Sequence, residues 1–416
     1  ARVPEPDAPV IVVTGRKPRP AILAGVVPEI ELGPEDIAGF GAGTVEELLE
    51  LLAPQTTGNG PPGGRPLVLI NGQRASGLDE IRNLPPEAVL RIEILPEEVA
   101  LRYGRRPGNK VVNLVLQPHF RAVTAEASYG GATEGGRSIG QVRVNVARIA
   151  PSGRWLLDAG YFRESLLTED ERPLAGGLGP FRSLLPRTRR LFLGGSFARA
   201  LSATTDLRLT ARVEEQDGES RTGPAPPGFV ADERSLPALL RTSRSHSASL
   251  GAALNGASAS WIWSATGSLD LVRQRTETEL ATSGAPIRER IRSRSQSGAL
   301  ELLAFRELAS LPAGPLTVSL TGRLEAFGYR NRSSLALPPG PDQLSRRTVS
   351  GQADLEIPLL DGSLAGLEGF GELSANLNLA LEHVSSFGTL KTIGAGLRWA
   401  PARWLWLTLS ASERDS

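Results

Sequence analysis

The feature that most constrains this chain is an alternation of apolar and polar residues, which runs from about residue 119 to residue 416. In residues 316–325, for example, Leu316, Val318 and Leu320 share one face, and Thr, Ser, Arg and Glu side chains take the other. Because successive side chains of a strand point to opposite faces, the pattern predicts strands with one apolar and one polar face. About 13 such strands are expected, near residues 121–130, 138–149, 154–164, 188–199, 203–215, 243–254, 258–273, 291–304, 314–328, 345–357, 369–382, 388–399 and 403–413.

The length and spacing of these segments favour a membrane barrel over a soluble sheet. Segments of about 10 to 15 residues exceed the five or six residues common in globular sheets and match a tilted membrane crossing. Short and long connections also alternate, as in outer-membrane barrels. The short ones are 150–153, 200–202, 255–257 and 400–402, and the long ones are 165–187, 216–242, 274–290 and 329–344. A large soluble β protein is the alternative, since sandwiches alternate too.

Charge on the polar face indicates which side faces lipid. An arginine on the lipid side at the midplane costs about 2–4 kcal/mol, so Arg208, Arg212 and Arg323 should point into a wet interior. The sequence therefore predicts a membrane all-β fold, an antiparallel transmembrane β-barrel. An antiparallel barrel whose chain starts and ends in the periplasm needs an even number of strands, and 13 is odd. An unclosed sheet would leave its edges exposed to hydrocarbon, which is not tolerated. We therefore expect the barrel to be incomplete here and further C-terminal strands to close it.

The residues before 119 show a different, mixed pattern. Residues 44–52 place apolar side chains at helical spacing, and Thr44 is suited to cap that helix. Short apolar strands are expected at 66–71, 90–95 and 111–116. The sequence therefore predicts a small α+β domain in front of the barrel, preceded by a proline-rich leader.

Composition argues against several classes of function. The chain has 46 Lys and Arg against 45 Asp and Glu, no cysteine and three scattered histidines. We therefore expect no nucleic-acid partner, no thiol nucleophile, no metal site and no cofactor. Neighbouring carboxylates such as Glu214 and Glu215 point to opposite faces of a strand, so they cannot form an acid–base pair. No apolar run approaches the roughly 18 residues of a membrane helix. We find no catalytic site and expect no enzyme.

Residues 86–116, PEAVLRIEILPEEVALRYGRRPGNKVVNLVL, resemble the plug domain of TonB-dependent outer-membrane receptors. The matching parts are the R-I-E-I-L run at 91–95, the Tyr103–Gly104 pair and the V-N-L-V run at 112–115. Upstream, residues 67–74 resemble the family's V-L-V-D-G strand. The resemblance implies three parts. These are a periplasmic leader at 1–29, a plug domain at 30–118 and a transmembrane β-barrel at 119–416.

A segment of the leader resembles the TonB box, which implies TonB and its inner-membrane energising complex as partners. The segment consists of Val10, Ile11, Val12, Val13, Thr14 and Gly15. It would bind TonB as an added β-strand through its backbone hydrogen bonds. The alternative is an N-terminal tail that has no partner.

The resemblance also implies ligand contacts on the plug loop that faces the outside. The candidates are Gln73, Arg74, Ser76, Thr56, Thr57 and Asn59. The alternative is a plain polar loop.

Ionic contacts between plug and barrel are a second expectation. Arg91 and Glu93 lie two residues apart on one strand and so point the same way. We expect them to pair with barrel charges such as Arg208 or Arg212. The alternative is an ordinary solvated strand face.

Taken together, the resemblance implies an energised receptor in the outer membrane of a Gram-negative bacterium. It would take up a scarce solute of the siderophore, vitamin or oligosaccharide class, with TonB and outer-membrane lipid as partners. The alternative is a non-energised channel or ligand-binding barrel with a degenerate plug.

Overall fold

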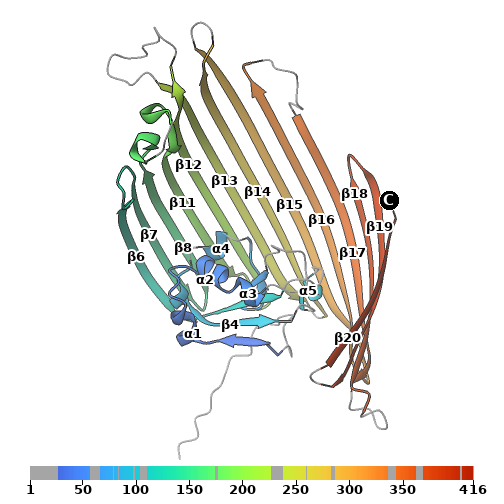
Figure 1. The fold of residues 1–416 in the computed structure, drawn as a ribbon. Helices are drawn as coiled ribbons and strands as arrows, with labels where there is room; N and C mark the ends of the chain where they lie inside the picture. Colours follow the sequence, from blue (N-terminus) through green and yellow to red (C-terminus); the bar gives the residue numbers. More distant parts are fainter. Residues whose placement is uncertain are drawn as a thin grey trace, which may run out of the picture.

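The computed structural model of the chain consists of a small N-terminal α+β domain lying against a large curved β-sheet (Figure 1). The structure describes residues 27–415 apart from 57–65, 78, 83, 97–98, 104–109, 174–176, 226–237, 259, 283–285, 336–342, 362–368 and 403–404. No helix in the described part of the chain is long and apolar enough to cross a membrane.

The N-terminal domain contains a five-stranded sheet in the order β1-β4-β5-β2-β3. Strands β2 and β5 pair in parallel and the other neighbours pair antiparallel. Its elements are β1 (Ile30–Leu32), α1 (Pro34–Gly39), α2 (Val45–Leu51), α3 (Ala53–Thr56), β2 (Leu67–Ile70), β3 (Gln73–Arg74), α4 (Asp79–Arg82), η1 (Pro86–Ala88), β4 (Val89–Leu95), α5 (Val99–Arg102) and β5 (Val111–Leu116). Thr44 caps α2 as the sequence predicts, because its Oγ1 accepts a hydrogen bond of 3.2 Å from the Glu47 N–H.

The large sheet, called the wall below, has 13 antiparallel strands in consecutive order apart from the β9–β10 insertion. Its strands are β6 (Phe120–Gly131), β7 (Ser138–Ala150), β8 (Gly153–Glu164), β11 (Arg187–Ala200), β12 (Thr205–Pro224), β13 (Ala238–Ser258), β14 (Trp261–Leu280), β15 (Ile287–Leu311), β16 (Gly314–Ser333), β17 (Gln343–Asp361), β18 (Glu372–Val384), β19 (Gly388–Ala402) and β20 (Leu405–Asp415). The connection between β8 and β11 holds the pair β9 (Leu167–Thr168) and β10 (Ser183–Leu185) with the turns η2 (Glu169–Glu171) and η3 (Gly179–Phe181).

The strand count and the antiparallel order confirm the predicted barrel wall, but several strands are longer than expected. Strand β12 continues to Pro224 and β13 begins at Ala238, inside the connection expected at 216–242. The apolar alternation ends earlier than the strands do. Beyond the last apolar residues, the strands stay paired and carry polar side chains that form cross-strand ion pairs, such as Arg187 with Glu219 at 2.8 Å.

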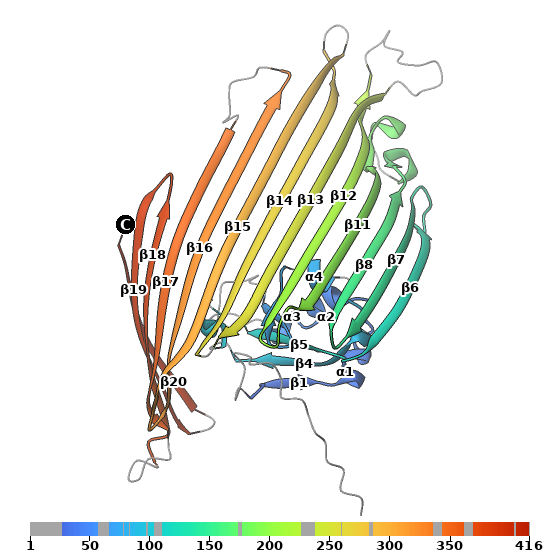
Figure 2. The same cartoon turned by 180° about the vertical axis from the view of Figure 1, so that it is seen from behind.

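The wall curves around the N-terminal domain without closing on itself within the described residues (Figures 1 and 2). Strands β6 and β20 are its two edges. The N-terminal domain lies at the end of the wall where short turns join β7 to β8 and β11 to β12, and the wall strands extend from there to the opposite end (Figure 2).

The two faces of the wall divide as the alternation predicts. Large apolar side chains are exposed on the convex face, among them Leu209, Leu320 and Leu377, which are 42%, 42% and 48% exposed. Arg208 and Arg323 lie on the opposite face. Arg208 donates there to the Ile70 carbonyl of the N-terminal domain, and Arg323 pairs with Glu301 of the wall. An apolar outer face and a charged inner face are the arrangement expected of a membrane barrel.

The apolar core of the N-terminal domain extends onto the wall. One buried cluster joins α2, β4 and β5 with the wall residues Ala147, Ile149 and Leu156. A second cluster joins Tyr103 and its neighbours to Leu303 and Phe305 of β15. The domain is therefore packed inside the curve of the wall and does not stand apart from it.

Candidate functional site

The loop after β2 carries side chains of the N-terminal domain to the wall. Asn71 and Gly72 form a two-residue turn with φ angles of 52° and 74°, a geometry that Asn-Gly sequences favour. The Asn113 side chain accepts from the Gly72 N–H at 2.8 Å, and the Tyr103 hydroxyl donates to the Gly72 carbonyl at 2.7 Å. These buried bonds fix the turn, and with it the following residue Gln73.

Glu80 on α4 lies at the centre of the contact between the two domains. Its carboxylate accepts from the Ser76 N–H at 2.6 Å and from the Ser76 hydroxyl at 3.0 Å. From the wall it is met by Arg154 of β8 and by Arg208 of β12, whose Nη1 lies 3.4 Å away. Both arginines and Glu80 are buried. Two positive side chains therefore converge on one carboxylate that is shielded from water.

Arg208 also binds parts of the N-terminal domain other than Glu80. It donates from Nη2 to the Gln73 side-chain oxygen at 2.8 Å and to the Ile70 carbonyl at 3.2 Å. Its Nε donates to Asp206 of its own strand at 2.9 Å. One wall arginine thus holds β2, β3 and α4 together.

A second group of ion pairs joins β3 of the N-terminal domain to β15 and β16 of the wall. Arg74 of β3 pairs with Glu301 of β15, and Glu301 also pairs with Arg323 of β16. Asn255 of β13 donates to the Arg74 carbonyl at 3.2 Å. We call the two groups together the interdomain network. Breaking a buried pair on one side leaves an unpaired charge, at a cost of about 3–5 kcal/mol.

The backbones of the two domains come very close at Gly251 of β13. A Cβ built there would lie 2.7 Å from the Ser76 carbonyl oxygen and closer still to the Thr210 hydroxyl. The hydroxyl groups of Ser76 and Thr210 are 3.5 Å apart. A glycine at position 251 is therefore what lets the N-terminal domain sit directly on the wall.

A small cavity of about 350 Å³ adjoins the network, between the N-terminal domain and strands β14 to β16. Arg74, Ser76, Glu301, Arg323 and Glu325 contribute its polar lining. The side chains that line it are largely paired with one another, so its polarity comes from ion pairs.

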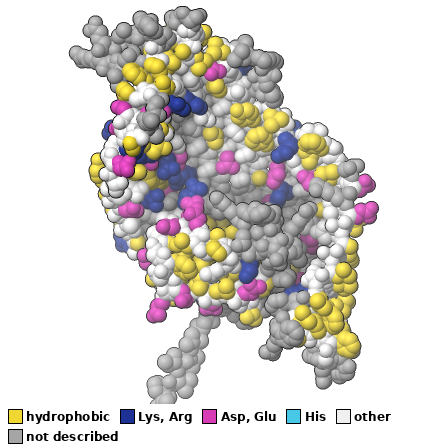
Figure 3. Space-filling view, in the orientation of Figure 1, with side chains coloured by type: hydrophobic (Ala, Val, Ile, Leu, Met, Phe, Trp, Pro, Cys, Tyr) yellow, Lys and Arg dark blue, Asp and Glu magenta, His cyan; other side chains and the backbone are white. Residues whose placement is uncertain are grey.

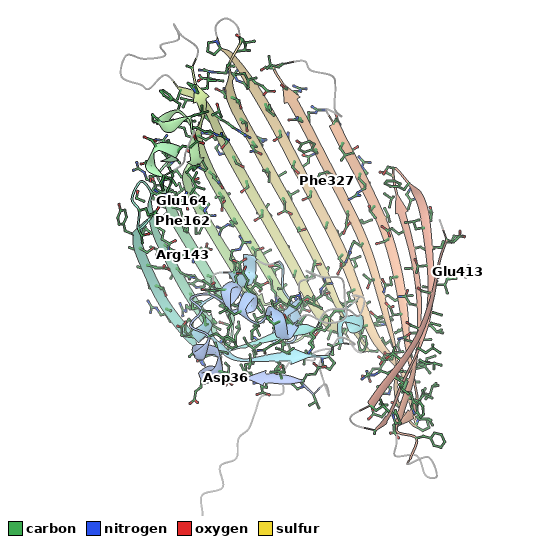
Figure 4. The ribbon with its side chains drawn as sticks, in the orientation of Figure 1. Asp36, Arg143, Phe162, Glu164, Phe327 and Glu413 are labelled. Atoms are coloured by element: carbon green, nitrogen blue, oxygen red, sulfur yellow. The ribbon has the colours of Figure 1, made fainter. Side chains whose placement is uncertain are left out.

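Above the N-terminal domain, the inner face of the wall carries an aromatic and arginine stack that the sequence analysis did not find. Phe162 and Phe192 are stacked with their centroids 6.1 Å apart. The Arg190 guanidinium lies 4.3 Å from the Phe162 ring and the Arg212 guanidinium 4.0 Å from the Phe192 ring. Figure 4 shows Phe162 on β8 beside Arg143 of β7. The available signal was an aromatic residue at a polar-face position of each strand.

Three of the six predicted ligand residues lie in the interdomain network. Gln73, Arg74 and Ser76 contact the wall, and Thr56 is 1% exposed with its hydroxyl donating to the Ala53 carbonyl. Thr57 and Asn59 lie outside the described residues.

The predicted ionic contacts are placed differently from the expectation. Arg91 pairs with Glu93 at 2.7 Å and with Glu31 at 3.8 Å, so these charges stay within the N-terminal domain. Arg212 pairs with Asp158 and Glu214 of the wall. Arg208 does reach the N-terminal domain, but its carboxylate partner there is Glu80. The physical reason is that Arg91 and Glu93 face their sheet neighbours Glu31 and Asn113, whereas α4 lies against β11 and β12.

Two further expectations concern the leader and metal binding. Residues 10–15, expected as the TonB box, lie outside the described residues. Among the described residues, no group of three or more His, Asp or Glu side chains is placed to hold a metal ion.

Figure 3 shows basic and acidic side chains intermixed above the N-terminal domain.

Comparisons with known proteins identify the fold. No family model matches the chain, and no curated protein matches its sequence. The structure is similar to two variants of the ferric enterobactin receptor PfeA from Pseudomonas aeruginosa, with TM-scores of 0.51 and 0.52, 14% identity and coverage of 94% of this chain. It is also similar to the RagAB peptide importer, with a TM-score of 0.51, 12% identity and coverage of 90% of this chain.

The matched proteins are longer than this chain. The chain spans 62% of the length of the PfeA structures and 57% of the RagAB chain. The matched part covers 90–94% of this chain and so includes both the N-terminal domain and the wall. The chain therefore has the plug-and-barrel fold of the TonB-dependent outer-membrane receptors.

Proposed function

We propose that this chain belongs to an energised receptor that imports a scarce solute across the outer membrane of a Gram-negative bacterium. The observation that carries the proposal is the interdomain network, in which buried charges of the plug meet buried charges of the wall. The solute would be of the siderophore, vitamin or oligosaccharide class, and the partners would be TonB with its energising complex and outer-membrane lipid. The proposal includes no enzymatic step.

A plug held by buried ion pairs is suited to be moved. Burying charges costs several kcal/mol per ion in desolvation. When the plug shifts and water enters, Glu80, Arg154 and Arg208 regain their hydration, which offsets much of the lost attraction. An apolar contact of the same area would gain nothing from the entering water. The network therefore fixes the resting position and still permits release.

The pull would act on residues 10–15. TonB would add to this segment as a β-strand, and the force would pass along the chain to the plug. Movement of α4 and β3 would separate Glu80 and Arg74 from the wall and open the lumen beside the cavity at Ser76.

The test asks whether uptake depends on the backbone N–H groups of the leader or on its side chains, using two substitutions at Val12. In the full-length receptor, Val12→Pro removes a backbone donor and should abolish uptake while leaving solute binding intact, because proline has no N–H. Val12→Thr keeps the donor and the β-branched shape and should leave uptake nearly unchanged. Growth of a deletion strain on single iron, cobalamin or glycan sources identifies the solute to use. Equal uptake by wild type and Val12→Pro would contradict the proposal.

A non-energised channel or ligand-binding barrel with a fixed plug is the second candidate. One observation favours it: the plug contacts four wall strands through the network, at Arg154, Arg208, Asn255 and Glu301. In that case, uptake should continue at the same rate after residues 10–15 are deleted.

A further inference from the structure

The outer face of the wall carries a block of six arginines on three neighbouring strands. Cross-strand register places them in two adjacent rows on β14, β15 and β16. The rows are Arg273, Arg294 and Arg330 in the first and Arg275, Arg292 and Arg332 in the second. We call these six residues the arginine block.

The register shows that the block faces away from the lumen. On β15, Glu301 points inward to Arg74 of the plug. Arg292 and Arg294 are separated from Glu301 by odd numbers of residues, and the pairing of β15 with β16 runs without a bulge through this stretch. Alternation therefore directs both arginines outward. All six arginines of the block are exposed.

The block lies just above the apolar part of the outer face. On β14, the outward positions run from Trp261 and Trp263 up to Leu269 and Leu271, and Arg273 follows. Ten residues at about 3.3 Å each, tilted by about 40°, span roughly 25 Å, which is the height of the apolar band of such barrels. The block is thus at the level of lipid headgroups. Figure 2 shows strands β14, β15 and β16 extending from the plug towards the opposite end of the wall.

Acidic side chains among the described residues do not balance the positive charge of the arginine block. Directly opposite like charges in a sheet destabilise each other. Glu277 pairs with Arg275 and also with Arg290, 2.9 Å away. Among the described residues, no carboxylate pairs with the other five arginines of the block.

The neighbouring strands β11 to β13 show the opposite arrangement at the same height. There Glu219 pairs with Arg187 at 2.8 Å, and Asp217 pairs with Arg189 and, at 2.7 Å, with Arg244. A shallow cavity of about 1100 Å³ extends over both regions. The two regions therefore differ in charge balance, and the arginine block is the one with an excess of positive charge.

We propose that the arginine block binds the phosphate groups of an outer-leaflet lipid. Side chains on directly opposed residues start about 4.5–5.5 Å apart at Cβ, so neighbouring guanidinium groups can converge on one phosphate. Arginine binds phosphate with two parallel N–H donors, which suits a fixed headgroup site. Nothing in this site depends on plug movement, so it is independent of the proposed uptake.

The surface below the block fits the acyl part of the same lipid. The two outward rows beneath Arg294 and Arg330 hold Gln296 with Gly328 and then Gly298 with Ala326, so three of these four residues are small. Leucines such as Leu300 and Leu324 continue the apolar face below them. Chains could therefore lie against the wall while the headgroup contacts the arginines.

The test measures lipid binding to the purified full-length receptor in detergent micelles, with bisphosphorylated lipid A as the probe and native mass spectrometry as the readout. A triple variant with Arg273→Gln, Arg294→Gln and Arg330→Gln should weaken binding by about tenfold or more, at roughly 1 kcal/mol for each cation near a charged lipid surface. The matched control is Arg187→Gln, Arg189→Gln and Arg244→Gln, from the balanced region, which should change binding by about twofold or less.

Two further measurements use the unaltered protein, so they do not depend on how the variants fold. Raising the salt from 0.1 M to 1 M shortens the screening length from about 10 Å to about 3 Å and should weaken lipid binding strongly. Inorganic phosphate at millimolar concentration should not displace the lipid. The proposal would be overturned by an equal loss of lipid binding in both triple variants, by lipid binding that does not change with salt concentration, or by displacement of the lipid by inorganic phosphate.

Discussion

Glu80 of the plug and Arg208 of the wall meet across the domain boundary, with Oε1 and Nη1 3.4 Å apart and side chains that are 1% and 3% exposed. The two residues are 128 positions apart in the chain. Both side chains are shielded from water. Glu80 has its counter-charges on the wall, in Arg154 and Arg208, whereas Arg208 also pairs with Asp206 of its own strand. The pair therefore couples the position of α4 to the position of β12.

Replacing Glu80 should loosen the plug. Glu80→Gln keeps the shape but leaves Arg154 and Arg208 without their shared carboxylate, at a cost of about 3–5 kcal/mol. Hydrogen exchange should become faster for the amides of residues 73–82, as measured by mass spectrometry on the folded receptor. The matched control is Glu46→Gln, which breaks the half-exposed pair with Arg82 within the plug and should cost about 1 kcal/mol or less. Equal effects of the two changes would contradict the assigned role.

Adding a methyl group at Gly251 should push the two domains apart. The new Cβ of Gly251→Ala would approach the Ser76 carbonyl oxygen to 2.7 Å, and such overpacking costs about 1–3 kcal/mol. We expect a lower thermal stability and weaker protection of Ser76 from hydrogen exchange. Gly322→Ala on β16 is the control, because a Cβ there meets nothing within 4 Å. A stability loss at Gly322 as large as that at Gly251 would argue against a specific clash.

A change in the turn that presents β3 should act without touching the wall. Gly72 has a φ of 74°, and an L-residue in that region costs about 1–2 kcal/mol. Gly72→Ala should therefore destabilise the hairpin and expose Gln73 and Arg74, with faster exchange of their amides. Gly39→Ala in α1, where the added Cβ meets nothing within 4 Å, should leave that exchange unchanged. Unaltered exchange at Gln73 in Gly72→Ala would show that the turn does not position the network.

The sequence predicted the wall better than the network, for a physical reason. Alternation reports which face of a strand is apolar, so the inward position of Arg208 and the outward position of Leu320 could be predicted from the chain alone. The partner of Arg208 could not be predicted, because it depends on how the plug docks. The strand with Arg91 resembled the family most closely, yet the contact is made by Glu80, which lies in a segment without any recognisable motif.

The arginine block could not be predicted from the sequence, because it depends on the register in which the strands pair. The motif Arg-x-Arg occurs at 273–275, 292–294 and 330–332. Each occurrence alone suggests a solvated strand end. Strand pairing brings the three motifs side by side, and this arrangement can be seen only after the register of β14, β15 and β16 is known.

A disulfide between plug and wall would test whether the plug must move during uptake. The chain has no cysteine, so a pair introduced as Ser76→Cys and Thr210→Cys would have no native competitor, and the replaced hydroxyl groups are 3.5 Å apart. Under oxidising conditions the pair should form a bond and stop solute uptake while binding continues, and a reductant should restore uptake. The single changes Ser76→Cys and Thr210→Cys are the controls, and both should transport with or without reductant. If the cross-linked receptor imports the solute at the normal rate, the plug does not need to leave β12, and the fixed-plug channel becomes the better description.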